Sequence, residues 1–281
     1  MRDYLQDLNI IGATMVYREG NQCRWSIDWL LKNCNKIIIL LDNFDEHTLQ
    51  IILDYRDKYP DIIQIVYSKI SVSDRCNKVQ GQSKRRFKLN QDVIREQVIQ
   101  ELHRINKEEL KVDLFSFFDS DEIPINQFPY YLEKFWYEIK DRQFMQIGFV
   151  EVFESFRIIL SQRMSPHGRV YKYNPEMSAL PYSTRTIYRP FELGRPWKVR
   201  HLLVHLCHFN EEYRKRRQFA DNIDFWERKR DAWLLPRDVR TMSVEEISQY
   251  QPGYHGSPPM FPSIPLEEIV NNKSKYEEYF I

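Results

Sequence analysis

The first half of the chain alternates short apolar runs with helical stripes, and this alternation limits the fold more than any other feature of the sequence. Four apolar runs are short enough and rich enough in β-branched and aromatic residues to be buried strands: 9–16, 36–41, 62–67 and 114–118. Stretches with apolar residues at helical spacing lie between them: 25–31, 47–59 and 84–105. Strands joined by helices over short connections form a parallel sheet with helices on both faces. We therefore expect an α/β fold with a mostly parallel central sheet flanked by helices.

The second half of the chain is less regular. Helix and strand formers dominate 126–140, 144–156, 199–207 and 211–229, whereas Pro, Gly, Ser and Tyr make 161–197 a predicted loop region. No stretch has the composition of a linker between folded domains. We expect one domain over 1–235, divided into halves 9–125 and 126–235, followed by a helical C-terminal extension over 236–281.

The whole-chain numbers exclude some classes of partner. The formal net charge is +1, so no overall field draws the chain to nucleic acid, and we expect no nucleic-acid partner. The four cysteines form no CxxC pair, which favours reduced thiols and a cytoplasmic location. No apolar segment approaches the roughly 20 residues that span a bilayer, so we expect no transmembrane segment, and any membrane contact would be peripheral.

An acidic run, Asp119-Ser120-Asp121-Glu122, follows directly after the fourth predicted strand. Carboxylates held this close repel one another, and a divalent cation such as Mn²⁺ or Mg²⁺ would remove that repulsion. Glu19 and Asp42 follow the first and second strands, and ligands of parallel sheets bind at the carboxyl ends of the strands. An acidic surface turn would have the same residues, but the position after a buried strand favours a metal site.

These features resemble glycosyltransferases of the GT-A fold, in the broad family-two-like group. The segment FFDSDEIP (117–124) resembles the Asp-x-Asp-Glu-Ile-Pro stretch of the β-1,4-mannosyl-glycoprotein N-acetylglucosaminyltransferase-like group. The loop 18–21, the acidic end of IIILLDNFDEHTL and the segment His208-Phe209-Asn210 are also similar to family segments. The chain lacks the family's Asp-Gly-Ser after the second strand and has Asn210 in place of Ser, which leaves the donor sugar open.

The resemblance implies a metal-bound nucleotide-sugar site, with a nucleotide-sugar-binding half at 9–125 and an acceptor half at 126–235. Asp119 and Asp121 are expected to hold Mn²⁺ or Mg²⁺, with Asp121 as the direct ligand and Asp119 also near the donor ribose. His208 is the expected third ligand, with His205 as the reserve. A nucleoside-diphosphate sugar, with UDP-sugars favoured, is the expected donor.

The same resemblance assigns the residues around the nucleotide. Asp42 is expected to accept hydrogen bonds from the nucleoside, and Glu19 to help close the base pocket. Arg85 or Arg86 would meet the diphosphate, because guanidinium groups match phosphate oxygens in pairs. A solvated start of the helix explains the same basic residues equally well.

Transfer of the sugar to a glycan or other hydroxyl acceptor, expected to be inverting, needs a carboxylate base. Glu151 and Glu154, in the apolar stretch FVEVFESF, are the candidates. Two alternatives remain. A sugar-nucleotide nucleotidyltransferase would normally have a glycine-rich loop after the first strand, where this chain has only Gly20. A catalytically inactive, sugar-nucleotide-binding relative would have the same binding residues.

Overall fold

The computed structural model describes residues 7–42, 44–69, 84–179, 195–209, 231–250 and 261–280, without the side chains of 84–93, 161–167 and 207–208. The chain divides into two compact units. Unit 1 comprises Met1–Asp121, Pro129–Gln146 and Pro166–Lys198, and unit 2 comprises Glu122–Phe128, Ile147–Ser165 and Val199–Ile281. The predicted domain limits at residues 125 and 235 stay predictions.

Unit 1 is built on a parallel sheet whose strands have the order β3-β2-β1-β4. The strands span Ile10–Val16 (β1), Lys36–Leu41 (β2), Ile63–Tyr67 (β3) and Leu114–Asp119 (β4). The ends of each strand lie within one residue of the apolar run that predicts it. A strand buried on both faces has apolar residues at every position, so the run itself marks where the strand begins and ends. The expected α/β fold, with a central sheet flanked by helices, is confirmed.

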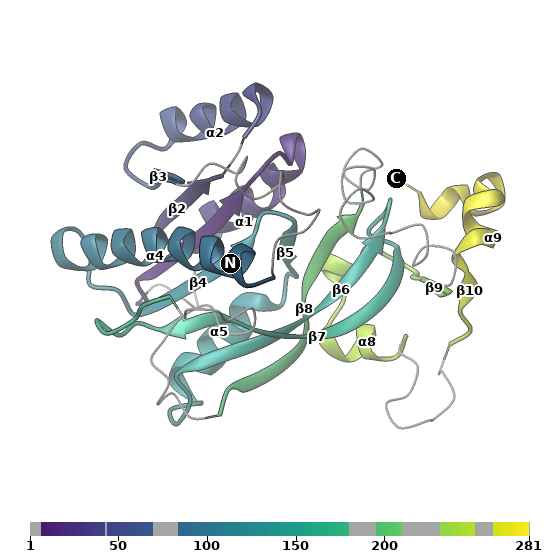
Figure 1. Ribbon diagram of the computed structural model, residues 1–281. Helices are drawn as coiled ribbons and strands as arrows, with labels where there is room; N and C mark the ends of the chain where they lie inside the picture. Colours follow the sequence, from purple (N-terminus) through teal and green to yellow (C-terminus); the bar gives the residue numbers. More distant parts are fainter. Residues whose placement is uncertain are drawn as a thin grey trace. The chain divides into compact units, whose positions relative to one another are not determined.

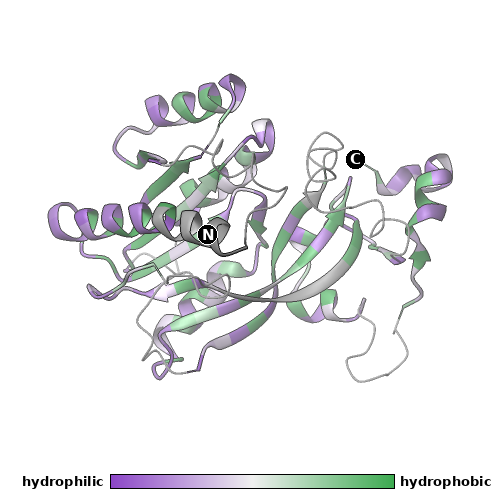
Figure 2. Ribbon diagram, in the orientation of Figure 1, coloured by the Kyte–Doolittle hydropathy of each residue, from purple (hydrophilic) through white to green (hydrophobic). Residues whose placement is uncertain are grey.

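Helices cover both faces of this parallel sheet (Figure 1). They span Cys23–Asn33 (α1), Glu46–Lys58 (α2) and Lys84–Glu108 (α4), and a 3-10 turn, η2, spans Gly20–Gln22. The apolar side of α4, with Ile94, Val98 and Leu102, packs on Ile11 and Ala13 of β1. Figure 2 shows the corresponding pattern, with hydrophobic colour along β1 and β2 and alternating colours along α4.

The opposite face of β1 approaches α1 very closely at Gly12. A Cβ atom at this position would stand 2.5 Å from Cδ2 of Leu30 and 2.8 Å from Sγ of Cys34. Real Cβ atoms do not come this close to other heavy atoms, so a larger residue would push α1 away from the sheet. Glycine at this position therefore sets the distance between α1 and β1.

An antiparallel strand extends the sheet of unit 1 beyond β4. Strand β7 (Ile158–Lys172) pairs with β4, and its Tyr171 lies opposite Phe115. The predicted loop region 161–197 is therefore wrong over 161–172. Pro166 and Gly168 give this stretch the composition of a loop, but the free edge of β4 needs backbone hydrogen bonds that composition does not report. The sheet of unit 1 is consequently parallel from β3 to β4 and antiparallel between β4 and β7.

Unit 2 contains the remaining parts of the strands. Strands β6 (Phe144–Phe153), β7 and β8 (Trp197–His208) each have residues in both units, and helix α5 (Phe128–Tyr137) lies in unit 1 except for its first residue. In unit 2, β6 lies between β7 and β8, β8 pairs with β5 (Glu122–Pro124), and β7 pairs with β9 (Asp231–Leu234).

The C-terminal part of unit 2 follows β9 along the chain. The elements there are η3 (Val239–Thr241), α8 (Val244–Ser248), β10 (Ile264–Pro265), α9 (Leu266–Asn271) and η4 (Lys273–Tyr279). Leu266, Ile269 and Tyr276 form a small core with Ala232 and Ile158. The predicted helix at 211–229 lies outside the described residues. Within the described part of the chain, no helix combines the length and the apolar character needed to cross a bilayer.

Candidate functional site

Polar and acidic residues of unit 1 follow the carboxyl ends of β1, β2 and β4. The backbone N–H of Asp42 donates to the carbonyl of Val16 at 2.9 Å, and that of Ser120 donates to the carbonyl of Met15 at 3.2 Å. Both bonds attach a neighbouring strand end to the end of β1. We call the set Glu19, Asp42, Asp119 and Asp121 the acidic edge. The carboxyl-end site predicted from the sequence is thus brought together in one unit, although the role of each residue stays a prediction.

Glu19 and Asp121 stand within electrostatic reach of each other at this edge. The backbone N–H of Tyr17 donates to Oε2 of Glu19 at 2.5 Å, and Ser120 also hydrogen-bonds the Glu19 side chain. Burial, and secondly the nearby Asp121 carboxylate, raise the pKa of Glu19 to about 8. Each carboxylate disfavours the charged form of the other, and a cation bound between them would stabilise the charged form of both.

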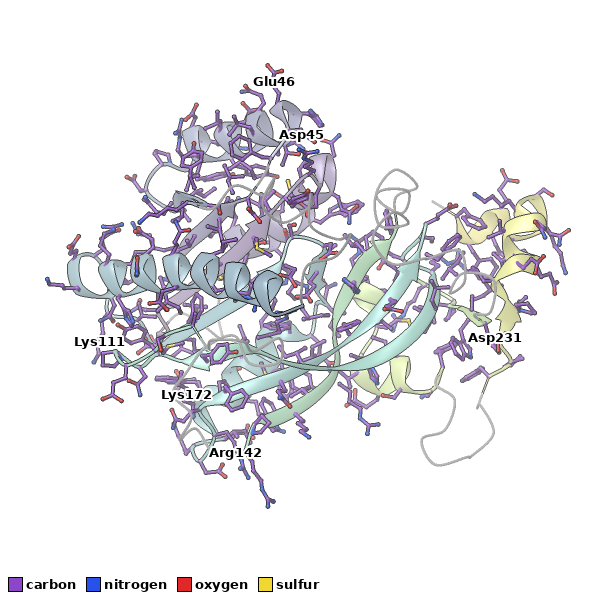
Figure 3. All side chains as sticks on the ribbon, in the orientation of Figure 1. Asp45, Glu46, Lys111, Arg142, Lys172 and Asp231 are labelled. Atoms are coloured by element: carbon purple, nitrogen blue, oxygen red, sulfur yellow. The ribbon has the colours of Figure 1, made fainter. Side chains whose placement is uncertain are left out.

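The loop that carries Glu19 is tied to the start of α2. Gly20 has a φ of +54°, and its N–H donates to Oγ1 of the buried Thr48 at 3.1 Å. The N–H of Thr48 in turn donates to Oδ1 of Asp45, the N-cap of α2, at 2.8 Å. Asp45 and Glu46 mark this helix start in Figure 3. Glycine suits the left-handed backbone here, so the turn holds Glu19 in place without strain.

Asp119 has a partner that the sequence did not reveal. Nη2 of Arg169, on β7, lies 3.1 Å from Oδ2 of Asp119. The Arg169 side chain is 5% exposed and the Asp119 side chain 36% exposed. The signal that could have revealed this pair is the i, i+2 spacing of Arg169 and Tyr171, which places both on one side of a strand. The composition of the stretch instead predicts a loop.

The acidic edge alone does not make a complete metal cage. Asp42 and Asp121 are buried, at 1% and 4% exposure, and buried carboxylates need compensation. In the described ranges, no group of three or more His, Cys, Asp or Glu side chains is arranged to hold a metal ion. Mg²⁺-type sites commonly take only one or two carboxylates, with substrate phosphates and water completing the shell. The edge therefore fits a cation that arrives with a nucleotide.

Three predicted site residues fall where side chains are not described. Arg85 and Arg86 belong to the first turn of α4, and His208 ends β8, but their side chains lie outside the described part. Their contacts with phosphate or metal stay predictions.

The two predicted catalytic carboxylates lie in unit 2. Glu151, on β6, is buried, and Glu154 follows β6 with a φ of +50°. The Nζ atom of Lys273 lies 2.7 Å from Oε2 of Glu154. This ion pair joins the turn after β6 to η4, and Glu151 is the more buried of the two carboxylates. Their roles as bases stay predictions.

The reserve ligand His205 lies opposite a member of the acidic run. In the antiparallel pairing of β5 with β8, His205 is the register partner of Glu122, which is 2% exposed. The His205 ring also contacts Phe149 edge to face at 5.0 Å. Register partners share one face of a sheet, so Glu122 and His205 are neighbours in unit 2.

His201 is buried in β8, with 3% exposure and a φ of +57°. Burial, and secondly the charge of Arg200, lower the pKa of His201 to about 4 from 6.5. The imidazole of His201 is therefore neutral in the folded state above about pH 4.

Stability should fall with acid through His201. Below pH 6.5 the unfolded chain binds a proton that the folded chain does not bind until about pH 4. This residue's contribution is thus complete above pH 6.5 and lost between pH 6.5 and 4, a change of about 3 kcal/mol. Asparagine tolerates a positive φ, so His201→Asn should unfold in urea with a flatter pH dependence, whereas the exposed control His47→Asn should retain the parental slope. Equal slopes for the parent and His201→Asn would refute the assignment.

Comparisons with known proteins give distant structural likenesses only. No protein family and no curated protein sequence matches the chain. A crystal structure of S. aureus TarS is 12% identical over 70% of this chain and 36% of its own, with a TM-score of 0.38. Glucosyl-3-phosphoglycerate synthase from Mycobacterium tuberculosis, in complex with Mn²⁺ and UDP-glucose, is 14% identical over 51% of this chain and 44% of its own, with a TM-score of 0.31.

A second structure of that synthase, with Mn²⁺, UDP and phosphoglyceric acid, gives a TM-score of 0.29 at 14% identity, over 51% of this chain and 44% of its own. The chain thus spans less than half the length of these proteins. At such TM-scores, any assignment of function rests on the site itself.

Proposed function

We propose that the acidic edge binds a nucleoside-diphosphate sugar together with a divalent cation, and that the chain is a glycosyltransferase of the GT-A type, family-two-like. The observation that supports this most is the approach of Glu19 to Asp121 beside Asp42 and Asp119, at the carboxyl ends of neighbouring parallel strands. A surface turn would leave these carboxylates in solvent, whereas Asp42 and Asp121 are buried.

Within this proposal each carboxylate has its own task. Asp121 is the direct ligand of Mn²⁺ or Mg²⁺, and Asp119 lies beside the ribose and the cation. Asp42 accepts hydrogen bonds from the nucleoside, and Glu19 closes the pocket. His208 is the proposed third ligand, and Arg85 or Arg86 the proposed contact with the diphosphate. When bound, the cation supplies positive charge that offsets the charge of the departing diphosphate.

The proposed acceptor is a glycan or another hydroxyl compound, and the proposed course is inverting. Glu151 or Glu154 would take the proton of the acceptor hydroxyl. Glu151 is the more buried of the two candidates. UDP-sugars are the favoured donors on the resemblance of the sequence. The cytoplasmic location also stays a proposal.

The direct test is nucleotide binding by titration calorimetry with and without metal. We expect the Kd of UDP to be lower by about tenfold or more in Mn²⁺ than in EDTA, because a charge-assisted contact contributes about 1.5 kcal/mol or more. GDP and CMP serve as nucleotide controls. An unchanged Kd of UDP in EDTA would remove the metal from the proposal.

Product analysis separates the alternatives. A transferase or a hydrolysing relative releases UDP from a UDP-sugar, whereas a nucleotidyltransferase forms the UDP-sugar from UTP and a sugar phosphate and releases inorganic diphosphate. A chain that binds UDP with Mn²⁺ but turns over neither substrate would be the inactive relative.

A further inference from the structure

Arg169 is a buried cation placed directly beside the acidic edge. Strand β7 runs antiparallel to β4, with Val170 opposite Ser116 and Tyr171 opposite Phe115. Since side chains alternate along a strand, Arg169 lies on the same face as Tyr171, which packs in the core with Phe115 and Phe117. The Arg169 side chain therefore extends from the core-facing side of β7, and its guanidinium contacts Asp119 at the end of β4.

The pair that Arg169 makes is asymmetric in exposure. A buried guanidinium is costly unless it is paired, and it keeps its charge at every physiological pH. Its partner Asp119 is 36% exposed, against 5% for Arg169. Asp119 therefore keeps part of its hydration while it neutralises the buried guanidinium. The arrangement presents an oriented carboxylate to solvent, held by a buried partner.

The two aspartates of the acidic run therefore stand in different electrostatic surroundings. Asp119 has the guanidinium of Arg169 at 3.1 Å, whereas Asp121 lies near the second carboxylate, Glu19. A divalent cation would offset the mutual repulsion of the Asp121 and Glu19 carboxylates. Arg169 already offsets the charge of Asp119, so Asp119 is suited to accept hydrogen bonds.

We propose that Arg169 is a positioning residue, which orients Asp119 as a hydrogen-bond acceptor for a nucleoside diphosphate. This inference rests on the proposed nucleotide site and changes one role within it: Asp119 contacts the nucleotide and does not hold the cation. The affinity that depends on Asp119 and Arg169 is independent of the cation, whereas the affinity that depends on Asp121 requires it.

The test is a double-mutant cycle read by calorimetry with UDP, in Mn²⁺ and in EDTA. Arg169→Met and Asp119→Asn should each raise the Kd of UDP by about tenfold in both media, as expected for a charge-assisted contact. The double variant should be no worse than either single variant, because both changes remove the same contact. The ratio of the Kd in EDTA to the Kd in Mn²⁺ should stay parental in all three, whereas Asp121→Asn should bring this ratio to about one.

A matched control comes from the opposite edge of the same sheet. Arg104, on α4, pairs with Glu109, which pairs with Lys36 at the amino end of β2. Arg104→Met removes an ion-paired guanidinium of unit 1 and should leave the Kd of UDP unchanged. Circular dichroism and thermal melting should accompany every variant. If Arg169→Met does not fold, Arg169→Lys replaces it, and its ammonium group, which lacks the planar fork of a guanidinium, should give only part of the parental affinity.

Three outcomes would overturn the inference. One is a Kd within twofold of the parental value for folded Arg169 variants, which would make the pair purely structural. Another is a Kd for the double variant that is raised by the product of the two single-variant factors, which would mean that the residues act independently. The third is a fall to about one in the ratio of the Kd in EDTA to the Kd in Mn²⁺ for Arg169→Met, which would mean that Asp119 acts through the cation. Failure of the parent itself to bind UDP in either medium would instead refute the proposed function, and with it this inference.

Discussion

Replacement of Asp121 by asparagine is expected to lower the rate of sugar transfer about a hundredfold, with the fold intact. Asparagine keeps the size of the side chain and one carbonyl oxygen, but it removes the negative charge that would hold the cation. Loss of one strong electrostatic contact at the transition state costs about 3 kcal/mol, or roughly a hundredfold in rate. The effect is measured as the rate of UDP release from a UDP-sugar at saturating Mn²⁺.

Stability without metal should move in the other direction. The Asp121 carboxylate is one of the two causes that raise the pKa of Glu19, so the two groups destabilise each other's charged form. Asp121→Asn removes this repulsion, and the variant should melt at or above the parental temperature in EDTA. It should gain no stability from Mn²⁺ with UDP, whereas the parent should.

Asp113→Asn is the matched control for this variant. Asp113 immediately precedes the amino end of β4, and its Oδ2 accepts the backbone N–H of Asn9 at 2.9 Å. Asparagine keeps an acceptor at that position, so activity should stay parental. If Asp121→Asn transferred sugar at the parental rate and was still stabilised by Mn²⁺ with UDP, the metal role of Asp121 would be wrong.

The parallel half of the fold was predictable because its signals are local. A run such as Lys36–Leu41 is continuous and β-branched, and the next polar residue, Asp42, marks where the strand ends. Parallel strands place their carboxyl ends at one edge, so the neighbourhood of Glu19, Asp42 and Asp119 follows from the order of elements. This is the part of the candidate site that sequence reasoning reached.

The rest of the candidate site depends on contacts between distant segments. Arg169 meets Asp119 across 50 positions of the chain, and Lys273 meets Glu154 across 119 positions. No local pattern encodes such pairs, since they arise only when β7 joins the edge of β4 and when the C-terminal segment packs in unit 2. The partner of each carboxylate therefore needed the structure.

Asp42→Asn should weaken UDP binding about 10- to 100-fold, and by the same factor in Mn²⁺ and in EDTA. Asp42 is 1% exposed, and its N–H is fixed to the carbonyl of Val16 at the end of β1. A hydrogen bond to an ionised group contributes about 1.5–3 kcal/mol, which corresponds to this range of affinity. Asparagine retains one acceptor oxygen and changes the other oxygen to a donor, so it disfavours a hydroxyl or N–H of the nucleoside.

Calorimetry with UDP in both media separates this nucleoside contact from a metal contact. A metal ligand would change the ratio of the two Kd values, as Asp121→Asn should, whereas a nucleoside contact leaves that ratio parental. Asp45→Asn is the control, because Asp45 caps α2 through the N–H of Thr48 and asparagine caps a helix equally well. Its Kd of UDP should be parental. A parental Kd for Asp42→Asn as well would leave its buried carboxylate a structural group of β2, and the nucleoside would then have to be recognised by other residues.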